Sequence, residues 1–194
     1  MRDDFDQDYY DRFYENPRTC AVDEAEAERQ AAFIAAYLSY LEVPVQRIAD
    51  IGCGLGRVLR ALGARYPQAK TTGVEYSSYV CERHGWTQGS VVDFQSAKPF
   101  DLVVCNDVIA YLDDRSCARA INNLSRLTRS ALFLGVLTKE DWRLCDTERT
   151  DDQQYLRPKA WYAKRLDKHF VNVGGGIYLK KPLAFPVWTM DRLN

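Results

Sequence analysis

The chain has 194 residues, and its 26 basic and 27 acidic side chains give a formal net charge of −1 at pH 7. This length fits one domain with a sizeable hydrophobic core, and the nearly balanced charge makes RNA and DNA unlikely partners. No apolar run is long enough to cross a bilayer, and the N-terminus lacks the apolar centre of a signal peptide. We therefore expect a single cytoplasmic domain over residues 1–194.

Cysteine and histidine usage indicates a reducing compartment. The chain has six cysteines, none of them in a C-x-x-C pair, and two histidines. Several cysteines fall within apolar patterns, where a free thiol packs as a small hydrophobic group. We expect neither a disulfide framework nor a bound metal.

The first 45 residues precede the predicted sheet. Aromatic side chains crowd positions 9 to 14. A helix is predicted over residues 23–41, because strong helix formers carry apolar residues at helical spacing and Pro44 follows them.

Strands and helices then alternate up to residue 137. We predict strands over 47–52, 70–76, 87–92, 101–106 and 130–137, and helices over 55–65, 77–84 and 114–127. This alternation is typical of a parallel sheet with helices on both faces.

The last third of the chain has a different pattern. Residues 138–157 are polar and predict a long loop, which is usually functional in a compact domain. A helix over 157–169 and strands over 170–180 and 183–193 follow. The glycine triplet at 174–176 falls inside the first of these strands and indicates a bulge or a close backbone approach. A second phosphate-binding loop is the less favoured alternative, because no helix follows it.

A glycine-rich turn after the first strand is the most informative motif. Gly52, Gly54 and Gly56 follow the apolar run at 48–51. Such a turn brings bare backbone and the N–H groups of a helix N-terminus close to a ligand. The dinucleotide fingerprint G-x-G-x-x-G would need glycine at the position of Arg57, so a nicotinamide-dependent oxidoreductase is a less favoured alternative.

The sequence D-I-G-C-G-L-G at residues 50–56 resembles the first motif of class I methyltransferases that use S-adenosylmethionine (SAM). The resemblance implies a Rossmann-like, doubly wound α/β fold with a mostly parallel seven-stranded sheet, helices on both faces and an antiparallel C-terminal strand. It also implies that Asp50 helps to hold the amino group of SAM. The turn residues expected beside the methionine part of SAM are Gly52, Cys53, Gly54 and Gly56.

The second predicted strand carries a candidate ribose-binding acid. Glu75 lies about 20 residues beyond the glycines, where an acid accepts hydrogen bonds from ribose hydroxyls in both NAD-binding and SAM-binding folds. Tyr76 follows it and is included in the expected cofactor site.

The segment at 89–94 resembles the adenine-binding turn of the family, and F-D-L-V at 100–103 resembles its fourth strand. The family often has an acid directly after the glycine of that turn, where this chain has Ser90. Asp93 could take the role three residues later, and the choice between them stays open. Val91, which lies between them, is included in the expected adenine site.

The end of the predicted fourth strand carries the candidate reaction centre. Asn106 is expected to contact SAM, and Asp107 and Tyr111 are the candidate catalytic residues. Asp107 acts either as a base or orienting group for the acceptor, or as a side-chain cap of the turn. Tyr111 either lines the acceptor pocket or packs in the core.

A small-molecule acceptor is expected between the N-terminal segment and the loop at 138–157. The N-terminal tyrosine-rich stretch resembles a segment that closes over SAM in small-molecule members of the family, so residues 1–45 are interpreted as a helical lid. The candidate acceptor-binding residues are Tyr14, Arg18, Trp142, Arg143 and Arg149. The arginines pair either with an anionic substrate group or with other surface charges.

The predicted function is SAM-dependent methylation of a small molecule. Besides the oxidoreductase, a non-catalytic module that binds SAM or a protein partner is a further alternative. The acceptor, the methylated atom and the oligomeric state do not follow from the sequence.

Overall fold

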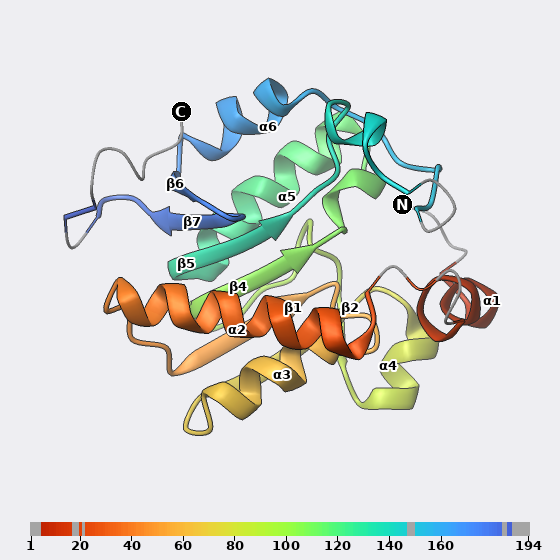
Figure 1. Ribbon diagram of the computed structural model, residues 1–194, viewed down its shortest axis with the longest axis horizontal. Coiled ribbons are helices and arrows are strands. Elements are labelled where there is room, and N and C mark those ends of the chain that lie inside the picture. The colour runs from red at the N-terminus through yellow and green to blue at the C-terminus, as the bar shows by residue number, and fades with distance from the viewer. Residues whose placement is uncertain (1–4, 17–19, 21, 147–149, 184–185, 188–194) are drawn as a thin grey trace.

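A seven-stranded sheet forms the centre of the protein in a computed structural model that describes residues 5–16, 20, 22–146, 150–183 and 186–187 (Figure 1). The strand order is β3-β2-β1-β4-β5-β7-β6. The strands are β1 (Arg47–Ile51), β2 (Lys70–Glu75), β3 (Thr87–Gln88), β4 (Phe100–Asn106), β5 (Thr128–Gly135), β6 (Phe170–Gly174) and β7 (Ile177–Lys180). The pairs among β1 to β5 are parallel, and β7 runs antiparallel to both β5 and β6. This topology confirms the predicted fold.

Helices cover both faces of the sheet. The helices α2 (Glu24–Tyr40) and α3 (Arg57–Arg65) pack on one face, and α5 (Asp114–Leu127) and α6 (Lys159–Leu166) pack on the other (Figure 1). Ile48 of β1 belongs to the first core and its neighbour Ala49 to the second. Successive side chains of a strand point to opposite faces, so each apolar strand contributes to both cores.

Shorter helices lie near the carboxyl ends of the strands. These are α1 (Gln7–Tyr10), the π-helix η1 (Asp11–Glu15), α4 (Ser78–His84) and the 3₁₀ helices η2 (Ile109–Tyr111) and η3 (Asp141–Arg143). Figure 1 shows α1 beyond the ends of the parallel strands, beside α4. Among the described residues, no helix is both long enough and apolar enough to cross a membrane.

Side chains fix the starts of the two long helices. Asp23 accepts a hydrogen bond from the Glu26 backbone at 2.7 Å, and Asp113 accepts one from the Ser116 backbone at 2.8 Å. Each cap satisfies a backbone N–H that has no partner within the helix and contributes about 1 kcal/mol. Both starts agree with the sequence prediction to within a residue.

The C-terminal prediction was wrong in one respect. Residues 170–180 form the β6–β7 hairpin and not one strand; within the glycine triplet, Gly174 ends β6, and Gly175 and Gly176 form the turn. All three glycines have positive φ, and a Cβ at Gly175 would lie 2.4 Å from the ring of Phe33 on α2. The packing of α2 against this turn therefore requires glycine there. The predicted strand over 183–193 lies mostly outside the described residues, and residues 183, 186 and 187 are not in a strand.

Candidate functional site

The glycine turn between β1 and α3 is held in a conformation that needs glycine. Gly52, Gly54 and Gly56 have φ values of 81°, 50° and 73°. A Cβ at Gly52 would lie 2.2 Å from the Val108 side chain, and one at Gly56 would lie 2.3 Å from the Trp86 ring. Side chains from two other elements thus close around the turn, which leaves its backbone as the surface available to a ligand.

Glu75 ties this turn to the end of β2. Its carboxylate is buried and accepts hydrogen bonds from the backbone N–H groups of Gly54 at 2.8 Å, Tyr76 at 2.7 Å and Ser77 at 3.1 Å. A carboxylate accepts about four hydrogen bonds, so Glu75 retains capacity for one more donor, such as a ribose hydroxyl.

Asp50 is a second buried carboxylate beside the turn. It is 4% exposed, and burial together with the negative charge of Glu75 raises its pKa from 3.8 to about 7. A cationic ligand group next to Asp50 would offset this desolvation and stabilise the ionised form.

Two small cavities flank the glycine turn, each of about 60 Å³. The first is lined on one side by Glu75, Gly89 and Val91, and the second by Asp50 and Cys53. The residues that line both are Tyr14, Gly52, Asn106 and Asp107. These four residues therefore mark the junction at which an elongated ligand would pass from one cavity to the other.

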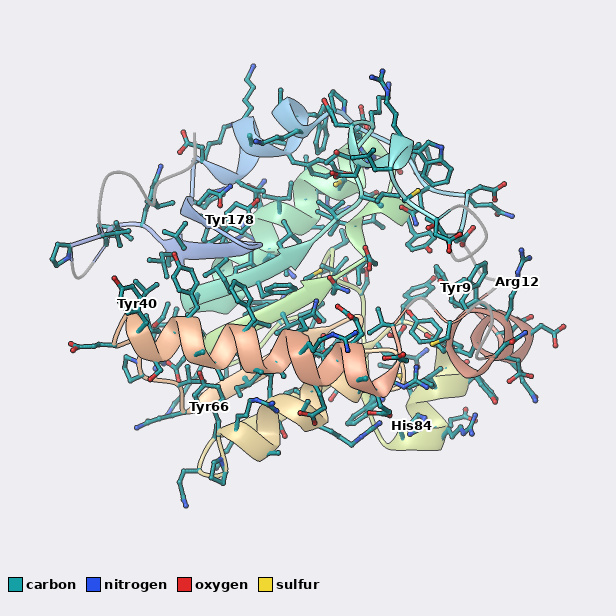
Figure 2. All side chains as sticks on the ribbon, viewed as in Figure 1. Tyr9, Arg12, Tyr40, Tyr66, His84 and Tyr178 are labelled. Carbon is teal, nitrogen blue, oxygen red and sulfur yellow. The ribbon has the colours of Figure 1, made fainter. Side chains whose placement is uncertain are left out.

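The N-terminal aromatic residues close the first cavity. Figure 2 shows Tyr9 on the side of α1 that faces the sheet, and Arg12 on the outer side. The Tyr9 hydroxyl lies 3.2 Å from the Tyr111 hydroxyl, and the Phe5 ring packs edge-on against Tyr111 with centroids 5.4 Å apart. The Tyr14 ring lies over Gly54, where a Cβ would approach it to 3.3 Å. Sequence analysis recognised this segment but selected only Tyr14 from it.

Arg57 fastens this segment to the glycine turn. Its guanidinium donates hydrogen bonds to the backbone carbonyls of Val22 at 2.7 Å and Tyr14 at 3.1 Å, and it forms an ion pair with Glu24 at 3.2 Å. The residue that departs from the dinucleotide fingerprint is therefore a structural anchor for the N-terminal segment. No local sequence signal pointed to this role.

Asn106 and Asp107 project from the end of β4 into the junction. Asp107 has a φ of 54°, a conformation that Asp and Asn tolerate better than most residues. The Asn106 amide donates to Asp107 Oδ2 at 3.1 Å. The Asp107 residue is exposed. The protein atoms around its carboxyl nevertheless remove part of the surrounding water, and this desolvation raises the pKa of the carboxyl.

The region around Tyr111 is held by the end of the long loop at 138–157. The Tyr155 N–H donates to the Ala110 carbonyl at 2.8 Å. Arg157, which is 4% exposed, donates to the Leu112 carbonyl and forms an ion pair with Asp114 at 2.7 Å. Arg157 is not among the residues predicted from the sequence, because Leu112 and Asp114 are far from it along the chain.

The structure brings together only some of the residues predicted for the adenine and the acceptor. The predicted strand at 87–92 ends at Gln88, and residues 91–93 form a turn. This turn directs Asp93 into a separate surface groove with Arg119, and the Ser90 hydroxyl accepts from the Val92 N–H; neither residue lines the two cavities beside the glycine turn. Val91 and Tyr76 do line the first cavity, whereas Trp142 and Arg143 line neither.

Arg18 and Arg149 lie outside the described residues. Within the part of the chain that the structure describes, no group of His, Cys, Asp and Glu side chains is arranged to hold a metal ion.

Comparison with known proteins agrees with this geometry. Residues 49–130 match the family model described as a methyltransferase domain. A trans-aconitate 2-methyltransferase of Klebsiella pneumoniae is 28% identical over 76% of this chain and 64% of the relative. The chain thus spans somewhat less than two thirds of that relative.

Two solved structures are similar to this chain. The sugar N-methyltransferase KedS8 of a Streptoalloteichus species is 26% identical, with a TM-score of 0.53 over 68% of this chain and 55% of that one. CalS10, an amino pentose methyltransferase of Micromonospora echinaspora whose structure contains SAM, has the same fold at 13% identity, with a TM-score of 0.65 over 93% of this chain and all of that one. The family-model match at residues 49–130, the strand order and the glycine turn thus make this chain similar to class I methyltransferases.

Proposed function

We propose that the protein is a cytoplasmic methyltransferase that binds SAM and transfers its methyl group to a small molecule. The observation that carries this proposal is the pair of cavities that meet at Tyr14, Gly52, Asn106 and Asp107. The chain spans under two thirds of the trans-aconitate 2-methyltransferase relative. The similar proteins are named for different acceptors, which are trans-aconitate, a sugar and an amino pentose. They therefore leave the acceptor open.

SAM fits the chemistry of both cavities. Glu75 has capacity for a ribose hydroxyl, and Gly89 and Val91 line the same cavity, where they would contact the adenine ring. Asp50 provides a negative charge for the amino group of the methionine part. The sulfonium would then lie at the junction, with its methyl group towards Asn106 and Asp107.

SAM supplies the reactive methyl group, and the protein supplies orientation and exclusion of water. Ligand pockets usually have volumes of about 300–1,000 Å³, whereas each cavity here has about 60 Å³. We infer that the segment at residues 5–16 moves outward when SAM enters and closes over it afterwards. Arg57, through its bonds to Tyr14 and Val22, sets the position to which this lid returns.

Calorimetric titration with SAM, S-adenosylhomocysteine (SAH) and NADH tests the proposal. We expect SAM and SAH to bind and NADH not to bind. The substitution Gly54→Leu should abolish binding, because the side chain would project towards the Tyr14 ring. Gly85→Leu is the matched control, since Gly85 also has positive φ but a Cβ there meets nothing within 4 Å.

NADH binding without SAM binding would overturn the proposal in favour of an oxidoreductase. Unchanged SAM affinity in the Gly54→Leu variant would show that the cofactor binds elsewhere. SAM binding with no methyl transfer to any acceptor would favour a non-catalytic SAM-binding module.

A further inference from the structure

The charges around the cavity junction are predominantly negative. Asp50, Glu75 and Asp107 line the cavities, and the buried Asp151 lies close enough to Tyr111 that its charge helps to raise the pKa of that phenol. Among the described residues that line these cavities, Arg57 is the one basic side chain. Its guanidinium is already engaged by two backbone carbonyls and Glu24.

An anionic acceptor would therefore meet like charges. A carboxylate normally binds where a guanidinium or ammonium group is available for it, and the described lining offers none beyond the engaged Arg57. A cationic acceptor would meet complementary charge.

Aromatic rings line the first cavity together with Asp107, where an acceptor would lie once the ribose and adenine of SAM occupy the side formed by Glu75, Gly89 and Val91. Phe5, Tyr9, Tyr14 and Tyr111 line the first cavity, and the Tyr9 and Tyr111 hydroxyls are 3.2 Å apart. Ring faces attract ammonium groups, and this attraction is strongest where water is excluded. Burial raises the pKa of both Tyr14 and Tyr111, so these phenols stay protonated and do not act as bases at neutral pH.

Asp107 is the carboxylate placed to meet the acceptor. The Glu75 carboxylate already accepts hydrogen bonds from three backbone N–H groups. Asp50 lines the second cavity, which we assign to the methionine part of SAM, and does not line the first. Asp107 lies at the junction, and its Oδ2 accepts from Asn106. Its Oδ1 has no hydrogen-bond partner among the described residues and is free to accept a proton from a ligand.

We propose that the acceptor is an amine, which Asp107 and the surrounding aromatic rings bind as an ammonium ion and which Asp107 deprotonates. This inference rests on the proposed function and specifies its substrate class. The raised pKa of Asp107 suits it to take a proton from an ammonium ion that stands beside the positive sulfonium.

The chemical step balances without a further reactant. The ammonium R–NH₃⁺ transfers one proton to the Asp107 carboxylate and becomes R–NH₂. The nitrogen lone pair then attacks the methyl carbon, the C–S bond breaks, and its electron pair returns to sulfur. The products are R–NH₂–CH₃⁺ and neutral SAH, and Asp107 releases its proton to solvent.

Three probes with one ring and different head groups test the inference: benzylammonium, benzyl alcohol and benzoate. Their affinities for the protein–SAH complex are measured by calorimetry, and methyl transfer is followed with radiolabelled SAM. We expect benzylammonium to bind at least about tenfold more tightly than benzoate, which corresponds to about 1.4 kcal/mol. Methyl transfer is expected to the amine alone.

The substitution Asp107→Asn removes the charge and keeps the shape. Asparagine tolerates the positive φ and can still accept from Asn106. We expect benzylammonium affinity to fall about tenfold and benzoate affinity to stay level or rise. Asp152→Asn is the matched control, because Asp152 is exposed and lines neither cavity.

Several results would overturn the inference while leaving the proposed function intact. These are preferential binding or methylation of benzoate, equal affinity for all three probes, no benzylammonium binding, or benzylammonium affinity that Asp107→Asn does not change. Failure of the wild-type protein to bind SAM and SAH would instead overturn the proposed function itself.

Discussion

The buried carboxyl of Asp50 should make the stability of the ligand-free protein depend on pH. Its pKa rises from 3.8 to about 7 in the folded state, chiefly through burial. Below pH 4 the carboxyl is protonated in both folded and unfolded chains, and above pH 7 it is ionised in both. Between these values the folded state holds the extra proton, so this group lowers the free energy of unfolding as pH rises.

The magnitude follows from the two pKa values. Each pH unit corresponds to 1.36 kcal/mol, so the ionised carboxyl costs the folded state on the order of 4 kcal/mol above pH 7. Asparagine resembles the protonated form in shape and carries no charge. We therefore expect Asp50→Asn to have the stability of the wild type near pH 4 and to exceed it by up to about 4 kcal/mol at pH 8.

Urea unfolding followed by tryptophan fluorescence at several pH values measures this difference. Comparison of the two proteins at each pH cancels the titration of groups they share. The same substitution should weaken SAM binding, because it removes the charge that we assign to the amino group. A stability difference that does not change between pH 4 and pH 8 would refute the reasoning, since Asp50 would then have an ordinary pKa.

Three further substitutions test the site. Gly52→Ala should lower the free energy of unfolding by about 2–3 kcal/mol and abolish SAM binding, because its Cβ would lie 2.2 Å from Val108 at a φ of 81°. Arg57→Met should speed SAM dissociation about tenfold in stopped-flow measurements, because the lid at residues 5–16 and the segment that joins it to α2 lose the hydrogen bonds at Tyr14 and Val22, which contribute about 1.4 kcal/mol together. Arg157→Met should cost about 3 kcal/mol in urea unfolding, because three buried or partly buried acceptors lose their donor.

Gly52→Ala and Arg57→Met each have a control within the same region. Gly63→Ala in α3 meets only an ordinary contact at 3.5 Å and should be neutral or stabilising. Arg65→Met removes a bond to Glu28 of α2 but none to the lid, so it should leave SAM dissociation unchanged. Equal effects of Arg57→Met and Arg65→Met would contradict the anchoring role of Arg57. An Arg157→Met variant as stable as the wild type would show that water replaces the lost donor.

The local patterns of the sequence determined most of the sheet and the position of the glycine turn. The apolar runs of β1, β4 and β5 predicted central strands, because a strand that is buried on both faces is apolar at almost every position. This signal is local and can be read from residue type and period. Gly52, Asp50 and Glu75 were recognisable because their chemistry and spacing lie within one strand–turn–helix unit and the strand that follows.

Tertiary structure decided the features that depend on contacts between distant segments. The hairpin at 170–180 replaced one long strand because the glycine turn packs under Phe33 of α2. Asp93 faces a separate groove because β3 ends after two residues. The anchoring roles of Arg57 and Arg157 come from backbone carbonyls that lie far along the chain from them. Such carbonyls are present at every residue and carry no sequence signature, so only the folded chain shows which of them a buried guanidinium will find.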